Sequence, residues 1–395
     1  MKRPSEPQSH RAIETALITL CVTVSLWFPF ADPAAGQRSG LTAGRELARA
    51  YDAILDARFG ELPALLPKTC PPAPSESCQL LRVIALWWEI QLDPHDTSHD
   101  NRFQTLADEA IEATDAWTQR EPTRAEAWFY LGGGYGARAQ WRAARGQQLA
   151  AVRDGKRIKE ALERAIALDP ELQDAYFGIG LYRYYAAVAP AAARMLRWLL
   201  LLPGGNRSEG LAQMLKTRAA GQLLASEADY QLALIYLWYE KQPARSLDLL
   251  EALRSRHPRN PHFAQLAAEV EDANDDHSAS LRSWQALLDA AVERRVARPA
   301  SVEARARLGI ALELDHRGDA AAAIPHLRAV IAARPAAPYG ARAQAHLQLG
   351  DAMARLRMRE EAISEYRAAL ASLPPGDRTK IGDRARAGLR ARRDR

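Results

Sequence analysis

The chain has 395 residues, of which 48% are hydrophobic and 26% charged, so it can bury a core and is not disordered along its whole length. Its formal charge of +5 belongs to the end of the chain, because residues 376–395 contain eight Lys and Arg but only three Asp. The remainder is close to neutral, which argues against a nucleic-acid-binding protein, whose folded body would carry the positive charge.

The N-terminus has the features of a secretory signal. Lys2 and Arg3 precede an uncharged apolar run at residues 16–30, and small residues follow at 34–36. The run is shorter than the roughly 20 residues that a membrane-spanning helix needs. We therefore expect residues 1–36 to be a signal peptide or an N-terminal membrane anchor. The chain would then be exported, and either periplasmic or anchored on the periplasmic side of the membrane.

Export bears on the two cysteines that follow. Cys70 and Cys78 bracket a proline-rich loop, and a pair this close in an oxidising compartment favours a disulfide over two free thiols.

His95 and His99 lie four residues apart, as metal ligands on a helix can, but Pro94 and the polar residues around them indicate a loop. The sequence therefore predicts no metal and no cofactor.

Beyond Leu41 the apolar residues recur with the period of amphipathic helices, and no stretch alternates as a strand would. Helices are expected at residues 41–58, 78–91 and 103–120. These helices would form N-terminal pairs within residues 37–124, with the Cys70–Cys78 loop between two of them.

From Ala125 onward one set of marks repeats. Near its end Gly350 and Ala362 are small where two helices would cross, Tyr366 fills the space beside them, and Pro374 stops the second helix. Related marks begin further units at Trp128, Tyr176, Tyr230, Phe263 and Leu308.

These offsets resemble the tetratricopeptide (TPR) pattern. The resemblance implies an all-α, right-handed solenoid of antiparallel helix pairs over residues 125–375, with residues 376–395 as a basic C-terminal capping helix or tail. The span from Trp128 to Pro170 exceeds the family spacing, which predicts two lengthened helices. The block at 177–211, a tyrosine-rich helix followed by an apolar run ending in LPGG, resembles the inclusion-body-clearance TPR family, some members of which handle lipids. It also resembles the uncharacterised bacterial relatives of that family.

The apolar run at residues 186–203 could be taken for a membrane segment. Pro190, Arg194 and Arg197 interrupt it, so a buried solenoid helix is the better interpretation.

In TPR proteins the first helix of each pair lines the inner wall of the array. The resemblance places the following residues on that wall: Phe129, Phe177, Leu181, Tyr184, Tyr185, Gln231, Ile235, Trp238 and Tyr239. This wall is aromatic and mostly uncharged, which is typical of a groove for a peptide, a helix or a lipid-like tail. The alternative is that these side chains pack against the lengthened helices that follow Tyr135.

No catalytic motif is present: the sequence lacks an HExxH pair, a GxSxG elbow and a phosphate-binding loop. We therefore expect a protein that is not an enzyme and has no catalytic residues. The predicted function is a scaffold or adaptor of the cell envelope that binds a protein or peptide partner and no nucleic acid. The alternative is a binder or carrier of an apolar ligand, such as a lipid.

Overall fold

A computed structural model describes residues 40–188, 204–374, 376, 377 and 379–390 of the chain. The expected signal or anchor at 1–36, most of the apolar run at 186–203 and the last five residues of the tail lie outside the described residues. Residues 39–395 form one unit by their contacts, and the architecture below is that of this unit.

Helices are the regular structure found in this part of the chain. The bounds are α1 (Gly44–Leu55), the 3-10 helix η1 (Phe59–Glu61), α2 (Leu62–Thr69), α3 (Ser75–Leu92), α4 (Asp100–Arg120), α5 (Ala125–Ala144), α6 (Gln148–Leu168), α7 (Ala175–Val188), α9 (Arg207–Ala220), α10 (Ala225–Trp238), α11 (Pro243–Arg256), α12 (Pro261–Ala273), α13 (His277–Val292), α14 (Pro299–His316), α15 (Ala320–Ala333), α16 (Ala341–Arg355), α17 (Arg359–Ala371) and α18 (Ile381–Arg390). Among the helices described, none is long and apolar enough to cross a membrane.

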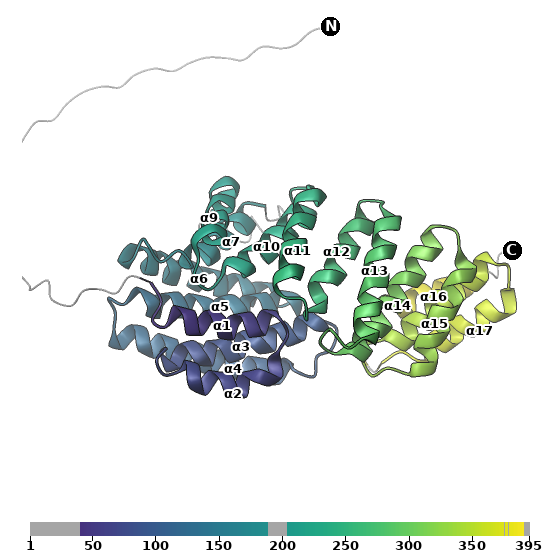
Figure 1. Cartoon of the computed structure of the whole chain (residues 1–395), viewed down its shortest axis with the longest axis horizontal. Helices are drawn as coiled ribbons and strands as arrows, with labels where there is room; N and C mark the ends of the chain where they lie inside the picture. Colours follow the sequence, from purple (N-terminus) through teal and green to yellow (C-terminus); the bar gives the residue numbers. More distant parts are fainter. Residues whose placement is uncertain (1–39, 189–203, 375, 378, 391–395) are drawn as a thin grey trace, which may run out of the picture. The chain divides into compact units, whose positions relative to one another are not determined.

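Successive helices from α5 to α17 pack as pairs, and each pair packs on the next (Figure 1). The pairs are α5 with α6, α7 with α9, α10 with α11, α12 with α13, α14 with α15, and α16 with α17. This arrangement confirms the predicted all-α solenoid of TPR-type helix pairs. The lengthened pair is also found, since α5 has 20 residues and α6 has 21.

Helices approach closely at the positions where the repeat pattern predicts small residues. A Cβ on Gly309 of α14 would lie 2.4 Å from the indole of Trp284 on α13, and one on Gly350 of α16 would lie 2.8 Å from the ring of Tyr366 on α17. Tyr366 also packs on Gly388 of α18, so the same ring joins the last pair to the final helix. Ile381 and Ala385 of α18 are buried, and α18 packs on both helices of the last pair.

The N-terminal helices also contact repeats that lie much later in the sequence. The pair α3 and α4 packs on α5. In addition, α3 lies against α10 and α12, and α1 is hydrogen-bonded to α10. The indole of Trp88 on α3 packs on Tyr230 of α10 and Phe263 of α12, with ring centroids 5.0 Å and 5.6 Å away. At the end of α1 the Asn260 amide donates to the Leu55 carbonyl at 2.7 Å. Helices remote in sequence thus share one hydrophobic core, which runs from α1 to α12.

Candidate functional site

The predicted inner-wall residues divide into a covered set and an exposed set. Five are buried: Phe129, Phe177, Tyr184, Gln231 and Ile235. Leu181 and Tyr185 are half-buried. Trp238 and Tyr239, at the end of α10, keep 53% and 48% of their surface exposed.

Helix α10, which carries three of the predicted wall residues, is covered on one side by the chain's own N-terminal helices. Tyr51 of α1 donates a hydrogen bond to Glu227 of α10 at 3.0 Å, and Gln91 of α3 donates to the hydroxyl of Tyr230 at 3.2 Å. The lengthened part of α5 also contributes, through Gln140, which accepts a bond from the predicted wall residue Gln231 at 3.5 Å. Glu227, Tyr230 and Gln231 of α10 therefore face the chain's own helices.

Glu227 shows how completely water is excluded there. Its carboxylate is buried between α1 and α10, and this desolvation raises the pKa of Glu227 to about 7, although the bond from Tyr51 acts in the opposite direction. The carboxyl is therefore only partly ionised at neutral pH.

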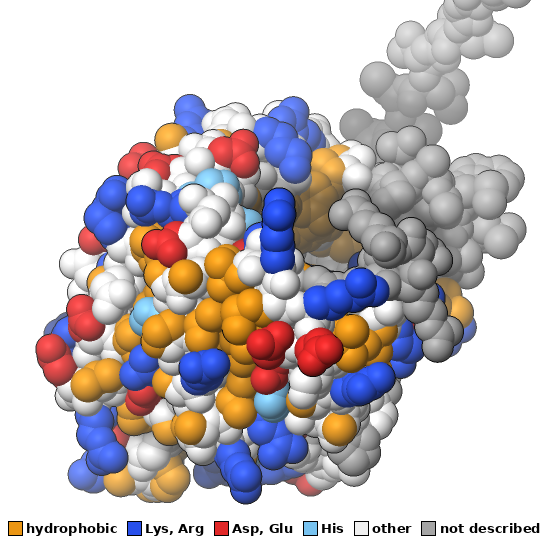
Figure 2. All heavy atoms as spheres, turned by 90° about the vertical axis from the view of Figure 1, so that its right-hand side faces the viewer, with side chains coloured by type: hydrophobic (Ala, Val, Ile, Leu, Met, Phe, Trp, Pro, Cys, Tyr) orange, Lys and Arg blue, Asp and Glu red, His pale blue; other side chains and the backbone are white. Residues whose placement is uncertain are grey.

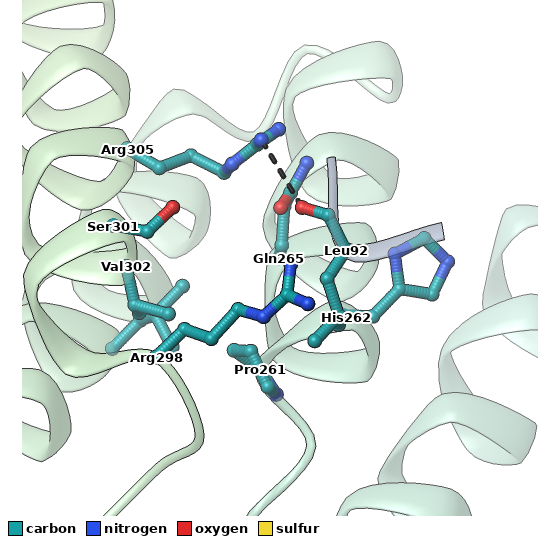
Figure 3. A pocket seen from close by; sticks show the side chains of 9 residues that line it. Leu92, Pro261, His262, Gln265, Arg298, Ser301, Val302 and Arg305 are labelled. Carbon is teal, nitrogen blue, oxygen red and sulfur yellow. Dashed lines mark hydrogen bonds between the residues drawn. The ribbon is translucent and has the colours of Figure 1, made fainter. Parts of the chain in front are cut away.

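Further along, the end of α3 closes the wall between α12 and α14 (Figure 3). Arg305 of α14 donates to the Leu92 carbonyl at the C-terminus of α3, with a distance of 3.3 Å, and lies 3.7 Å from Asp93. A cation is favourable at this position because the helix dipole makes the C-terminus negative. Asp93 in turn accepts the backbone N–H of Tyr339, just before α16, at 2.8 Å.

The cavity that remains beside Arg305 is too small for a side chain. Its volume is about 10 Å³, close to the minimum that holds one water molecule. Its lining comes from α3, α12 and α14, and includes Leu92, Pro261, His262, Gln265, Arg298, Ser301, Val302 and Arg305 (Figure 3).

We call the exposed Trp238 and Tyr239, together with the half-buried Tyr185, the aromatic patch. The ring of Tyr239 meets the ring of Tyr185 edge-on at 5.4 Å and that of Tyr184 at 6.0 Å, so α7 and α10 hold the patch together. Beneath it the Tyr184 hydroxyl donates to Glu240, which also pairs with Arg207 of α9. The patch thus combines exposed aromatic surface with a fixed support.

A second hollow lies between α11, α12 and α13. Its volume is about 440 Å³, within the usual range for small-molecule sites. Apolar residues (Pro258, Ala264, Leu287 and Val296) and charged residues (Glu251, Arg254, Asp289 and Arg295) both line it. Sequence reasoning missed this hollow, because its residues come from three helices and share no motif.

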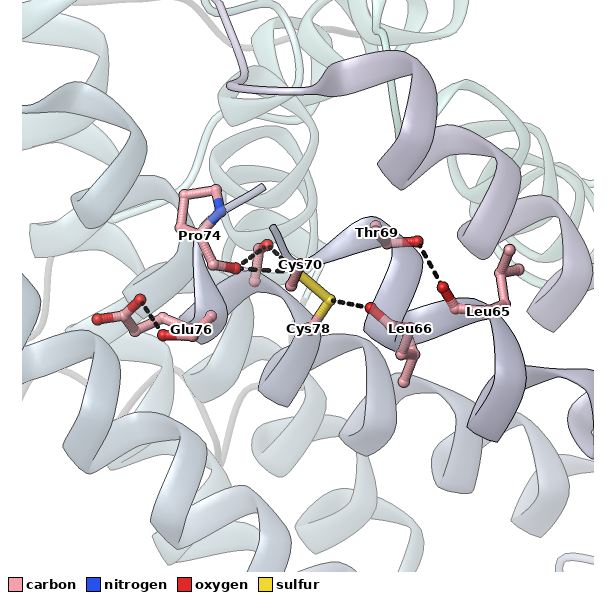
Figure 4. The surroundings of a disulfide bond; sticks show 9 residues. Leu65, Leu66, Thr69, Cys70, Pro74, Glu76 and Cys78 are labelled. Carbon is pink, nitrogen blue, oxygen red and sulfur yellow. Dashed lines mark hydrogen bonds between the residues drawn. A yellow bond between two sulfur atoms is a disulfide. The ribbon is translucent and has the colours of Figure 1, made fainter. Parts of the chain in front are cut away.

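Cys70 and Cys78 are joined by a disulfide, which ties the end of α2 to the first turn of α3 (Figure 4). The adjoining loop is also held locally, since the Ser77 hydroxyl donates to the Pro74 carbonyl at 2.6 Å. The disulfide therefore fixes the start of the helix that covers the inner wall.

The basic end of the chain does not present a uniformly positive face. Figure 2 shows Lys and Arg side chains intermixed with Asp and Glu around a central group of hydrophobic side chains at this end of the array. Within α18, Arg384 pairs with Asp351 at 3.2 Å and Arg386 with Asp383 at 2.7 Å.

No protein-family model matches the sequence, and no curated protein matches it. Solved structures that resemble the fold include the Cut9–Hcn1 complex of the APC/C, with a TM-score of 0.49 and 13% identity over 87% of this chain and 55% of that one. Yeast Tom70 gives 0.42 and 13% over 81% and 65%. NprR, in complex with its peptide NprX, gives 0.41 and 8% over 89% and 83%. The chain spans less than two thirds of the length of the first two.

Proposed function

We propose that this chain is a non-enzymatic adaptor that binds a protein or peptide partner through its aromatic patch. Stacks of helix pairs expose extended surfaces that suit such binding. The observation that carries the proposal is the exposure of Trp238 and Tyr239 beside a wall that is otherwise covered. Large aromatic side chains dominate the binding energy of protein interfaces, and here two adjacent ones remain open to solvent.

The exposed surface is large enough to matter. A Trp side chain buries roughly 150–250 Å² when fully covered, so covering the exposed half of Trp238 removes about 100 Å² from water. At about 25 cal/mol per Å² this contributes about 2–3 kcal/mol, or roughly 30- to 150-fold in affinity. The Tyr239 ring is held by its contacts with Tyr184 and Tyr185, so it loses little freedom on binding.

We further propose that the adaptor works in the cell envelope, as an exported protein that is periplasmic or tethered to the membrane through residues 1–36. The Cys70–Cys78 disulfide supports an oxidising compartment. The basic, then apolar, then small-residue order of residues 1–36 supports export.

The second candidate function is binding of an apolar ligand. The hollow of about 440 Å³ between α11 and α13 favours it, because that volume would hold part of a lipid or a small apolar molecule. Native mass spectrometry after gentle extraction separates the two functions: the adaptor retains a protein or peptide, whereas the carrier retains a small apolar mass.

The patch itself is tested by a double variant, Trp238→Ala with Tyr239→Ala, compared with Val292→Ala. Val292 ends α13 and is 60% exposed, so its variant also removes exposed apolar surface but leaves the patch intact. Wild type and Val292→Ala are expected to retain the same partner in affinity purification, and the double variant to lose it while keeping its helical circular dichroism. Equal retention by all three proteins contradicts the patch as the binding site.

A further inference from the structure

Four side chains that could bind a metal ion converge where α12, α13 and α14 meet. Asp272 lies near the end of α12, His277 begins α13, and Glu313 and His316 lie in the last turn of α14. One carboxylate oxygen or ring nitrogen from each residue lies within 4.8 Å of all the others. The sequence did not suggest this cluster, because its members span 45 positions and share no motif.

The four nitrogen–oxygen separations in this cluster are close to those of a tetrahedral site. Nδ1 of His277 lies 3.1 Å from Oδ1 of Asp272 and 3.1 Å from Oε2 of Glu313. Nδ1 of His316 lies 3.3 Å and 3.9 Å from the same two oxygens. Four ligands bound tetrahedrally at roughly 2.0–2.1 Å from Zn²⁺ lie about 3.3–3.4 Å from one another. A central ion therefore needs only small movements of these side chains.

Hydrogen bonds alone leave the cluster poorly satisfied. Each Nδ1 carries at most one proton, yet Nδ1 of His277 faces two carboxylate oxygens at equal distance. Glu313 is only 1% exposed, and neither it nor Asp272 pairs with Lys or Arg among the residues described. Burial, and then the charge of Asp272, raises the pKa of Glu313. A divalent cation would offset both negative charges.

The cluster also has the outer support typical of metal sites. The Ser280 hydroxyl donates to Oε1 of Glu313 at 2.9 Å, so the second carboxylate oxygen is held and Oε2 is left facing the two histidines. The other three side chains are about one-third exposed, which leaves a path for an ion to enter from solvent. Glu313 thus forms the fixed inner side of the site, and the remaining ligands form its outer side.

We propose that Asp272, His277, Glu313 and His316 bind one Zn²⁺ ion per chain. Two imidazoles and two carboxylates suit zinc, and four protein ligands are typical of a structural rather than a catalytic zinc site. The ion joins the α12–α13 turn to the end of α14, and so fastens two consecutive helix pairs. This site is separate from the aromatic patch on α7 and α10 and does not depend on the adaptor function.

The test is isothermal titration of ZnCl₂ into the full, untagged chain, with Co²⁺ absorption as a second readout of tetrahedral coordination. We expect one Zn²⁺ per chain with micromolar or tighter affinity. The variant His277→Ala with His316→Ala should lose this binding, and Glu313→Gln should weaken it by about tenfold or more while preserving the shape of the side chain. The matched control is His95→Ala with His99→Ala, which also removes two histidines, and it should bind as the wild type does.

Two results overturn the proposal. One is a wild-type chain that binds no Zn²⁺ at micromolar concentrations. The other is a Glu313→Gln or His277→Ala/His316→Ala protein that binds one Zn²⁺ as tightly as the wild type. If the double histidine variant does not fold, Asp272→Asn gives the same information, because that side chain is about one-third exposed and keeps its size.

Discussion

Replacing Glu227 by glutamine should stabilise the protein more at higher pH than at lower pH. The unperturbed pKa of this carboxyl is 4.5, and burial raises it to about 7 in the folded chain. Between these values the folded state binds more protons than the unfolded state, so ionisation of Glu227 lowers stability as the pH rises. Below about pH 4.5 the penalty is absent, and above about pH 7 it is complete.

The magnitude follows from the size of the shift. A difference of roughly 2.5 pKa units, at 1.36 kcal/mol per unit, corresponds to about 3 kcal/mol of stability lost by pH 8. Glutamine carries no charge and keeps one oxygen to accept the bond from Tyr51, while its NH2 group replaces the other carboxylate oxygen at both pH values. The stability of Glu227→Gln relative to the wild type should therefore be about 2–3 kcal/mol higher at pH 8 than at pH 5.

Urea unfolding followed by circular dichroism at pH 5 and pH 8 measures this difference. Comparing the two proteins at each pH cancels the other buried titratable groups, such as His257 and Glu269, whose pKa values also shift. Glu251→Gln on α11 is the control, because it makes the same substitution at a largely exposed carboxylate. An advantage of Glu227→Gln that is equal at both pH values, or larger at pH 5, refutes the reasoning.

Three further predictions concern packing and the disulfide. Gly309→Ala should lower the free energy of unfolding in urea by about 1–3 kcal/mol, because the added Cβ would meet the Trp284 ring. In the control Gly136→Ala the added Cβ meets nothing within 4 Å, so that variant should be neutral or stabilising. Equal effects of the two changes would contradict the close packing at Gly309. Trp88→Ala should lower the free energy of unfolding by about 3–5 kcal/mol, because the indole fills the contact between α3, α10 and α12. The same change at the exposed Trp238 should lower it far less. Similar losses for the two variants would count against the covered wall. Reducing the Cys70–Cys78 disulfide should destabilise the chain by about 2–3 kcal/mol. The melting temperature of a Cys70→Ala/Cys78→Ala variant should not respond to dithiothreitol. An unchanged melting temperature in the reduced wild type would contradict a stabilising role of the disulfide.

Local features of the sequence predicted the repeat pairs well, because each pair is specified within about 40 residues. Pro170, Pro258, Pro335 and Pro374 follow the ends of α6, α11, α15 and α17 within three residues. A proline there cannot supply the next helical hydrogen bond, so its position alone marks where a second helix ends.

The covering of the inner wall could not be predicted in the same way. It depends on pairs such as Tyr51 with Glu227 and Leu55 with Asn260, which lie 176 and 205 positions apart. The repeat pattern placed residues such as Ile235 on an inner face, but it carries no information about what lies against that face. The exposure of Trp238 depends on the same contacts, because α1 and α3 do not cover the end of α10.

Hydroxyl-radical footprinting of the folded chain, read by mass spectrometry, tests both the covered wall and the aromatic patch at once. It reports the solvent accessibility of each aromatic side chain. We expect strong labelling of Trp238 and Tyr239, which are exposed. Trp88, Tyr230 and Phe263 are buried and should stay protected until the chain is unfolded. Labelling of Tyr230 and Phe263 comparable to that of Trp238 in the folded chain would show an open inner wall and contradict it.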